Sequence, residues 1–476
     1  MKPARRSRAV RWCCSAAWLL LVGCQWVPTL GHQRLAADLD AKRASVPDAW
    51  QGGVDWSQEQ PTGWLTDFEG GSLRSVVEQA LAGNPGLKAA AARVDQARAG
   101  VGTATAALLP TLDGNGTASR SQRPGDQRFP GLAQQANRFT TGLSAAWELD
   151  LWGRLADQRG AALADLAARQ SDYHAARLSL AANAAQSAVT VTELRLLVAL
   201  SQADVEARQT QLKLLESQLD RGIDTETAAL DVSLGRADLA RSKADVEERS
   251  RQLDGARRSL ETVLGGYPEG KIRGLDQLPR LRGSVPAGLP AALLSRRPDV
   301  LAAEQRLRAT LNRESAAKKA FLPSIRLTGD RGFTSQQLAS LISTPSATWT
   351  MASQLTQPLF EGGRLLAGVK SARASYDEAL NLYAETVLTA FREVETALAA
   401  ERFWSAQEAE LRRALEQART AEKLASGQYE RGLADVLTLL ESRRRAFDAE
   451  RALIAAQANL ARNRLALHLA LGGDWE

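Results

Sequence analysis

The sequence predicts a mainly helical protein with a small β part, built from two copies of one unit. Proline, the strongest helix breaker, is absent between Pro130 and Pro268 and again after Pro358, so very long helices are permitted there. Three short segments alternate apolar and polar residues, as strands do, and a fourth near 110–120 gives a weak, Gly-rich signal of the same kind. Several motifs recur about 210 residues apart, which indicates an internal repeat. Aromatic residues make up only 5% of the 476-residue chain, and this favours slim helix contacts over a thick globular core.

Residues 1–23 resemble a secretory signal that is removed from the mature chain. Five basic residues and no acidic ones precede the apolar run WCCSAAWLLLV, which is too short to span a bilayer as a helix. The motif LVGC, Leu21–Cys24, resembles a bacterial lipobox, which predicts that Cys24 carries a lipid such as palmitate. Gln25 follows, and by resemblance to enterobacterial lipoproteins this favours the outer membrane. The alternative is an ordinary cleaved signal with an incidental cysteine.

Removal of that segment changes what the charge of the chain implies. The whole chain has a formal charge of +6, which falls to about +1 because the 60 basic residues lose five and the 54 acidic residues lose none. A nucleic-acid partner is therefore not predicted. One cysteine would remain in the mature chain, which excludes a disulfide framework and a thiolate metal site.

The repeat divides the rest of the chain. The motif NPGLKAAAARVDQARA at 84–99 corresponds to RRPDVLAAEQRLRATLNRES at 296–315, and VLGG at 263–266 corresponds to ALGG at 470–473. We therefore expect a first repeat at 73–266 and a second at 297–476. Each would run helix, strand pair, very long helix, break, helix. An N-terminal extended segment at 24–72 and a linker at 267–296 would lie outside the repeats.

The long helices are predicted at 154–220 and 364–430, followed by shorter ones at 226–263 and 435–470. Each of the longer two would span roughly 100 Å at about 1.5 Å per residue. From Tyr376 to Leu398 the larger apolar residues recur at steps of three and four, which gives one apolar stripe for core packing, as in coiled coils. The helices are interrupted by Arg-Gly pairs, so we expect turns at about 221–226 and 430–434.

The strands are predicted at about 110–120, 139–149, 323–333 and 348–357. Between 139 and 149, Leu143 and Trp147 share one face, while Ser144 and Glu148 share the other. This alternation fits either a half-buried sheet or a membrane barrel. Aromatic residues near the strand ends and long polar turns favour the barrel. Four strands cannot close a barrel, since bacterial barrels have at least about eight, and open edges in lipid are not viable. The barrel therefore requires an oligomer, and three chains would supply twelve strands.

Several motifs in a consistent order closely resemble TolC-type outer-membrane efflux factors, in the lipoprotein branch that pairs with RND pumps. The resemblance covers nearly the whole mature chain. The motifs are AAWELDLWGRLADQ (145–158), RRPDVLAAEQRLRATLNRESAAKKAFLPSIRLTG (296–329), LTQPLFEGGRL (355–365), AFREVETALAAE (390–401) and ERGLADVLTLLE (430–441).

The resemblance implies a homotrimer whose twelve-stranded outer-membrane β-barrel continues as a periplasmic α-helical barrel. An equatorial belt, here 25–70, 267–296 and the C-terminal end, would wrap the helices. The implied partners are a periplasmic adaptor (membrane fusion protein), an inner-membrane RND pump and outer-membrane lipid. The breaks in the helices would be hairpin turns at the periplasmic tips, where such channels close and where the adaptor docks. The implied docking residues are Arg221, Gly222, Arg431 and Gly432.

The resemblance also implies a periplasmic gate. Leu437, Glu441 and Arg444 correspond to the family residues that line the closed aperture, and their i, i+4, i+7 spacing puts them on one helix face. Leu437 would form an apolar plug, and carboxylate–guanidinium pairs would latch neighbouring helices. In the first hairpin Asp231 stands 210 residues before Glu441. The alternative is a solvated face with an incidental ion pair.

No catalytic constellation or metal-ligand spacing appears, so we expect neither an enzyme nor a cofactor. The three histidines are isolated in the sequence. The predicted function is a passive trimeric duct of a tripartite RND-type efflux system that exports drugs or other small molecules. The same duct serving metal-ion efflux or type I secretion remains an alternative. A lipid-anchored coiled-coil scaffold without a pore is another.

Overall fold

The computed structural model describes residues 35, 37–39, 50–51, 63–69, 72–122, 135–221, 228–282 and 290–473. The predicted signal at 1–23, the predicted lipidation site Cys24 and the tip residue Gly222 lie outside these ranges. The chain divides into two compact units. The first comprises Met1–Ser45, Arg93–Gln170 and Ala302–Ala384, and the second comprises Val46–Ala92, Ser171–Leu301 and Glu385–Glu476.

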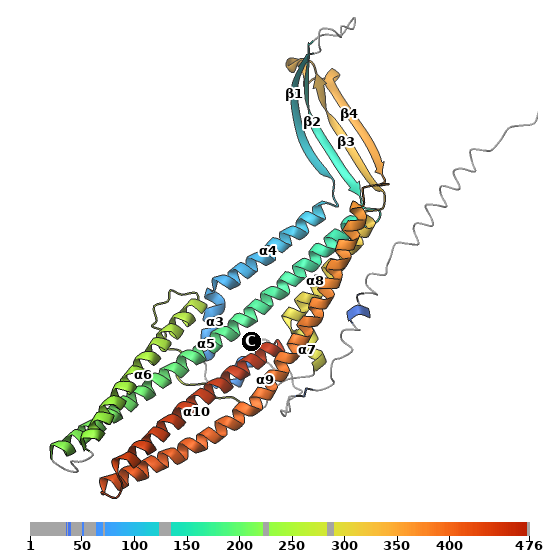
Figure 1. Ribbon diagram of the computed structural model, residues 1–476. Helices are drawn as coiled ribbons and strands as arrows, with labels where there is room; N and C mark the ends of the chain where they lie inside the picture. The colour runs from blue at the N-terminus through green and yellow to red at the C-terminus, as the bar shows by residue number, and fades with distance from the viewer. Residues whose placement is uncertain are drawn as a thin grey trace, which may run out of the picture. The chain divides into compact units, whose positions relative to one another are not determined.

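The first unit contains a four-stranded antiparallel sheet (Figure 1). Its strands follow the order β1-β2-β3-β4, so each of the two strand pairs is a hairpin and the hairpins pair through β2 and β3. Helix α4 precedes the β1–β2 hairpin and α8 precedes the β3–β4 hairpin. The bounds are α4 Pro85–Ala106, β1 Thr111–Gln122, β2 Gln135–Leu149, α8 Pro298–Lys319, β3 Ser324–Ser335 and β4 Ala347–Thr356.

The register of the sheet separates an apolar face from a polar face. Leu143 of β2 stands opposite Arg331 of β3, which stands opposite Trp349 of β4, and residues two apart along a strand share that face. The residues of this apolar face include Leu112, Phe139, Leu143, Trp147, Ile325, Leu327, Phe333, Trp349, Met351 and Leu355. The polar face carries Asp113, Asn115, Ser144, Glu148, Arg326, Asp330, Thr350 and Gln354.

A pair of glycines lets β2 and β3 approach closely on the polar face. Gly142 stands opposite Gly332. A Cβ added at Gly142 would lie 2.8 Å from the Gly332 Cα, and one added at Gly332 would lie 2.3 Å from the Thr141 carbonyl oxygen. Side chains here are sterically excluded, and glycines at such positions mark tight bends of curved sheets. The sheet is therefore built to curve toward its polar face.

The second unit contains most of two helical hairpins, whose longer helices α5 and α9 have their first residues in the first unit, together with shorter connecting elements (Figure 1). Salt bridges join α5 to α6 through Glu216 and Arg236, and α9 to α10 through Arg419 and Glu450. We name α5–α6 the first hairpin and α9–α10 the second. The bounds are η1 Trp64–Asp67, α3 Ser72–Gly83, α5 Arg154–Asp220, α6 Ala228–Val263, α7 Pro290–Arg296, α9 Arg364–Glu430 and α10 Val436–Leu471.

These elements confirm the predicted fold class, a mainly helical chain with a small β part and two repeats. The repeats match in detail, since α5 and α9 each have 67 residues and α6 and α10 each have 36. None of the helices in the described ranges is both long enough and apolar enough to cross a membrane.

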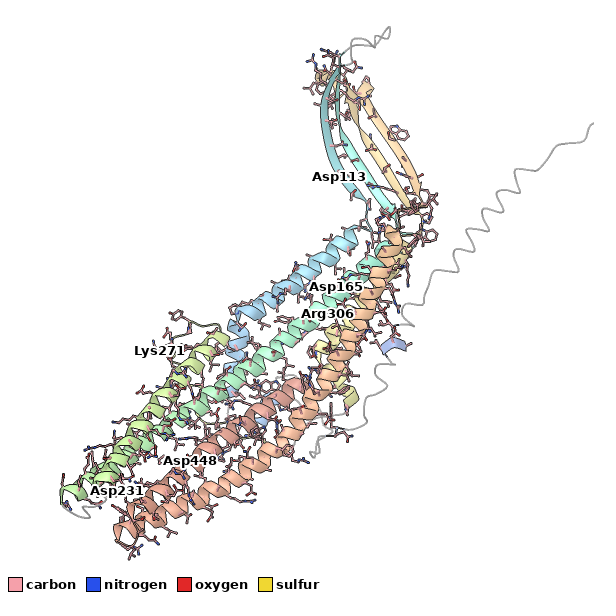
Figure 2. The ribbon with its side chains drawn as sticks, viewed as in Figure 1. Asp113, Asp165, Asp231, Lys271, Arg306 and Asp448 are labelled. Carbon is pink, nitrogen blue, oxygen red and sulfur yellow. The ribbon has the colours of Figure 1, made fainter. Side chains whose placement is uncertain are left out.

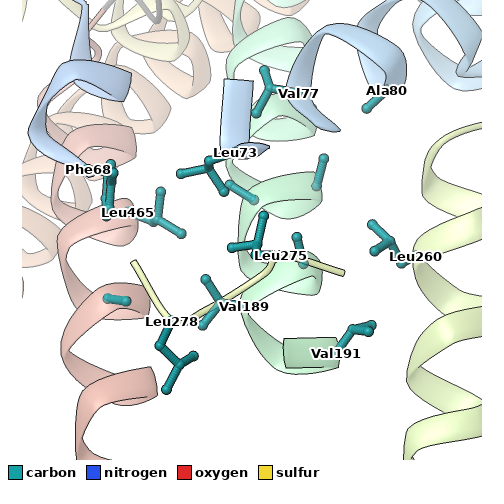
Figure 3. Close-up of a cluster of buried hydrophobic side chains, with 14 of the residues drawn as sticks. Phe68, Leu73, Val77, Ala80, Val189, Val191, Leu260, Leu275, Leu278 and Leu465 are labelled. Carbon is teal, nitrogen blue, oxygen red and sulfur yellow. The ribbon is translucent and has the colours of Figure 1, made fainter. Parts of the chain in front are cut away.

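The main apolar core of the second unit lies where the N-terminal elements and the 267–282 segment meet the helices (Figure 3). Its buried residues include Val77 of α3, Val189 of α5, Leu260 of α6, Leu465 of α10 and Leu275 of the 267–282 segment. Four alanines of α5 are also fully buried, and their small side chains let other elements pack close to the helix: Ala181, Ala184, Ala185 and Ala188.

The 63–69 segment also pairs with 280–282. The Arg282 amide donates to the Asp67 carbonyl at 2.8 Å, and the Glu69 amide donates to the Arg280 carbonyl at 3.0 Å. Two of the segments expected to form an equatorial belt are therefore joined by backbone hydrogen bonds.

A buried charged cluster ties η1 to α9 and α10. Arg464 and Glu401 form a salt bridge at 2.7 Å, with side chains only 4% and 6% exposed. Asp67 contacts Arg464 at 3.3 Å and His468 at 2.8 Å. Burial alone would raise the pKa of Asp67, but the hydrogen bond and charge of His468, together with Arg464, lower it below its ordinary value. Trp64 stacks on the His468 ring with 6.1 Å between centroids.

In each repeat a hydrogen bond joins a residue near the start to a residue near the end, and the two bonds lie at equivalent positions. In the first repeat the Asn84 side-chain amide donates to the Val263 carbonyl at 2.8 Å. In the second, the Arg297 guanidinium donates to the Ala470 carbonyl at 3.1 Å. Arg297 also pairs with Asp299 at 2.6 Å, so the Arg-Pro-Asp motif joins the start of α8 to the end of α10.

Candidate functional site

The turn of the second hairpin is set by Gly432. The Leu433 amide donates to the Gln428 carbonyl and the Gly432 amide donates to the Tyr429 carbonyl, both at 2.9 Å. This hydrogen-bond pair defines a Schellman motif, whose left-handed residue is usually glycine because other side chains are strained there. Gly432 has φ +72°. The predicted helix break at Arg431-Gly432 is therefore a C-terminal cap of α9.

Asp435 starts the returning helix α10. Its carboxylate accepts a hydrogen bond from the Thr438 amide at 2.8 Å, which satisfies one of the free amides of the first helical turn. Hydrogen bonds from the Thr438 side chain and amide lower the pKa of Asp435, so the cap is charged at neutral pH. The tip is thus closed by a glycine cap on one helix and an aspartate cap on the other.

The three predicted gate residues of α10 lie on its exposed surface just after this cap. Leu437 is 58% exposed. Arg444 donates two hydrogen bonds of 2.9 Å to Glu441, one to each carboxylate oxygen. This bidentate geometry is the strong form of the guanidinium–carboxylate pair. The pair lies within one chain, so no latch between neighbouring chains is needed to form it.

Two residues that the sequence analysis missed extend this pair. Arg445 donates to Glu441 at 2.7 Å, and Arg444 also contacts Asp448 at 3.2 Å (Figure 2 labels Asp448). Hydrogen bonds from Arg444 and then Arg445 lower the pKa of Glu441 to about 2. Helical spacings of three and four residues were the available signal for both contacts.

Asp231 and Leu437 line the same small groove, which has a volume of about 160 Å³. Its apolar walls are leucines of α5, α6 and α10 together with Val436, and Asp238 and Arg208 are among the polar lining residues. Asp238 and Arg208 are 3.1 Å apart and form a salt bridge. The structure therefore brings Asp231 of the first hairpin and Leu437 of the second hairpin together, whereas Glu441 and Arg444 lie outside this groove.

The tip of the first hairpin is described only in part. α5 ends at Asp220 and Arg221 is exposed, while Gly222 lies outside the described residues. The two hairpins are joined near their tips by a hydrogen bond of 3.1 Å from the Gln218 side chain to the Tyr429 hydroxyl. This contact between the hairpins was not predicted, because the repeat shows which residues of the two hairpins are equivalent and not which residues touch.

Comparison with known proteins places the whole chain in context. The family model described as "Outer membrane efflux protein" matches residues 76–266 and 289–473. Outer membrane protein OprJ of Pseudomonas aeruginosa is 32% identical over 454 residues, which cover 94% of this chain and 94% of OprJ. Cation efflux system protein CusC of Escherichia coli O6:H1 is 29% identical over 463 residues, which cover 96% of this chain and 97% of CusC.

A solved structure of the outer-membrane channel OprN resembles the fold closely. The two chains superpose with a TM-score of 0.82 at 28% identity, over 90% of this chain and 97% of that one. The helical hairpins and the sheet described above thus have a counterpart in a protein whose structure is that of an outer-membrane channel.

Proposed function

Because the chain belongs to the outer membrane efflux protein family, we propose that three copies form a passive duct through the outer membrane of a Gram-negative bacterium. The duct is the outer-membrane channel of a tripartite RND-type efflux system and exports drugs or other small molecules. The resemblance to TolC-type efflux factors implies an inner-membrane pump and a periplasmic adaptor as partners, and the solved relative OprN is an outer-membrane channel. The energy for export therefore comes from the pump, and the duct itself catalyses no reaction.

The observation that carries this proposal is the four-stranded sheet with one apolar face, one polar face and two unpaired edges. Within the described part of the single chain, β1 pairs only with β2 and β4 pairs only with β3. Edge strands are not viable in lipid, and pairing of β4 with β1 of a neighbouring copy satisfies both edges at once. Three copies give twelve strands, with the apolar faces toward lipid and the polar faces toward a water-filled lumen.

The tips of the helical hairpins form the gate of the duct. Leu437 is an exposed apolar residue next to the tip, which suits a plug at a narrow aperture. Glu441 and Arg444 hold each other within one chain, so they stiffen α10 and present a fixed charge pattern to a neighbouring chain. Asp231 supplies a carboxylate from the first hairpin to the same gate. Arg221, Gly222, Arg431 and Gly432 form the surface that receives the adaptor.

Single-channel conductance tests the duct and the gate together. Detergent-purified mature trimers are placed in a planar bilayer and compared with a variant that carries alanine at Leu437, Glu441 and Arg444. We expect a small parent conductance that rises severalfold in the variant. No conductance from either form, given heat-resistant trimers, would refute the duct and favour a scaffold without a pore. Equal conductance of both forms would refute only the gate.

The similarity to CusC favours a second candidate substrate class, metal cations, because CusC is named a cation efflux protein. A deletion strain complemented with this chain distinguishes the two classes. Restored resistance to hydrophobic antibiotics supports drug export, whereas restored resistance to copper or silver salts alone supports the cation alternative.

A further inference from the structure

One arginine stands well inside the apolar face of the sheet, where a lipid-facing surface is expected to be uncharged. Arg331 is exposed and lies between Leu143 on β2 and Trp349 on β4. Among the described residues its side chain has no hydrogen-bond or ion-pair partner. The other arginine of this face, Arg120, lies near the loop end of β1 and donates to Gln135 at 2.6 Å. Arg331 is thus the exceptional charge within the apolar band.

No carboxylate of the sheet can neutralise Arg331. The three acidic residues of the strands, Asp113, Glu148 and Asp330, all lie on the polar face according to the strand register. The described connection between β3 and β4 contains no acidic residue. The same holds for the sheet of a neighbouring copy, because its strands have the same faces. The counterion must therefore come from outside the protein sheet.

The depth of Arg331 indicates what that counterion is. Its partner Leu143 is four residues from Phe139, at the loop end of the apolar face, and six residues from Leu149, at the other end. At about 3.4 Å per residue and a strand tilt of about 40°, Arg331 lies roughly 10 Å inside the loop end of the apolar band. A long arginine side chain can extend most of that distance toward the interface. This inference rests on the proposed placement of the sheet in the outer membrane.

The surroundings of Arg331 suit a lipid. A shallow groove of about 700 Å³ runs along this face and is lined by Leu143, Phe333, Ile342 and Trp349 beside Arg331. Trp349 is 75% exposed and Ile342 is 78% exposed. Exposed apolar side chains such as these can line acyl chains, and guanidinium groups bind phosphate with paired, charge-assisted hydrogen bonds.

We propose that Arg331 and this groove form a binding site for a phosphate-bearing lipid of the outer leaflet. The acyl chains lie along Leu143, Phe333 and Trp349, and the guanidinium of Arg331 holds the headgroup phosphate. Three copies of the chain present three such sites. The site orients the duct in the membrane by fixing one level of the sheet to the headgroup layer.

Native mass spectrometry of the trimer tests this site. Purified trimers are equilibrated with micelles containing phosphatidic acid, whose headgroup is a phosphomonoester, and an equal amount of phosphatidylcholine. We expect preferential retention of about three phosphatidic acid molecules per trimer, one for each chain. Loss of a charge-assisted hydrogen-bond pair in Arg331→Gln should weaken this retention about tenfold or more.

The matched control is Arg326→Gln, which makes the same change five residues away on the polar face of the same strand. It should retain phosphatidic acid like the parent. Equal retention by Arg331→Gln and the parent, or equal loss in both variants, overturns the site. Displacement of the lipid by millimolar inorganic phosphate would overturn the lipid assignment in favour of a free-phosphate site. Trimers that conduct but show no lipid preference refute this site alone, whereas trimers that do not conduct refute the duct.

Discussion

The buried salt bridge between Arg464 and Glu401 gives a sharp stability prediction. Glu401→Ala removes the acceptor of two hydrogen bonds from Arg464, at 2.7 and 3.2 Å, and of one from Asn463 at 2.9 Å. Asn463 keeps its bond to the Ala397 carbonyl at 3.0 Å. Arg464, only 4% exposed, keeps just the longer contact to Asp67. Removing one partner of a buried ion pair costs about 3–5 kcal/mol, and here the remaining charge keeps only this weaker partner.

For a unit of this size the loss corresponds to a fall of roughly 5–10 °C in the midpoint of thermal unfolding, at about 2 °C per kcal/mol. The assay is the far-ultraviolet circular dichroism of detergent-purified protein on heating. The informative comparison is the double variant Glu401→Leu/Arg464→Met, which removes both charges and should recover most of the midpoint.

A control variant, Glu410→Ala, breaks the exposed pair with Arg413, whose side chains are 71% and 69% exposed. It should shift the midpoint by less than about 2 °C, since surface pairs contribute about 1 kcal/mol or less. If the double variant unfolds at as low a temperature as Glu401→Ala, the loss comes from packing and the reasoning from buried charge is refuted.

Three other predictions concern the gate, the sheet and the N-terminus. The pKa of Glu441 is lowered from 4.5 to about 2, so its pairing with Arg444 is complete above pH 4.5 and is lost as pH falls through 2. Bilayer conductance should therefore stay low from pH 7 to about pH 4 and rise only in stronger acid. A rise centred near pH 4.5 would contradict the assignment. Gly332→Ala should reduce the yield of heat-resistant trimers because its Cβ meets the Thr141 carbonyl at 2.3 Å, whereas Gly116→Ala, with nothing within 4 Å, should not. Cys24→Ser should abolish labelling of the mature protein by radioactive palmitate, and undiminished labelling would place the lipid elsewhere.

Local patterns predicted the long helices well. The expected helices 154–220 and 364–430 coincide with α5 and α9, because the absence of proline and the Arg-Gly breaks determine where such helices begin and end. The Gly-rich strand expected near 110–120 gave a weak signal, yet β1 extends over Thr111–Gln122. Pairing with β2 along its whole length, rather than its own propensity, holds it in the sheet.

Contacts between distant residues could not be predicted from one sequence. His468 looks isolated in the chain, but it is 1% exposed and bonded to Asp67, some 400 residues away. The same is true of Gln218 and Tyr429, and of the opposed Gly142 and Gly332, whose meaning depends on the strand register. Helical spacing brings residues together within one element only, so the shared helix face of Leu437, Glu441 and Arg444 was predictable and the buried cluster was not.

The hydrogen bonds from Asn84 to Val263 and from Arg297 to Ala470 have an evolutionary consequence. They occupy equivalent positions, and in each repeat they join the first residues to the last. A module whose two ends meet can be copied and fused head to tail without straining its backbone. The chain therefore has the form expected of a gene duplication, in which six copies of an ancestral half-length polypeptide are equivalent to the three fused chains of the proposed duct.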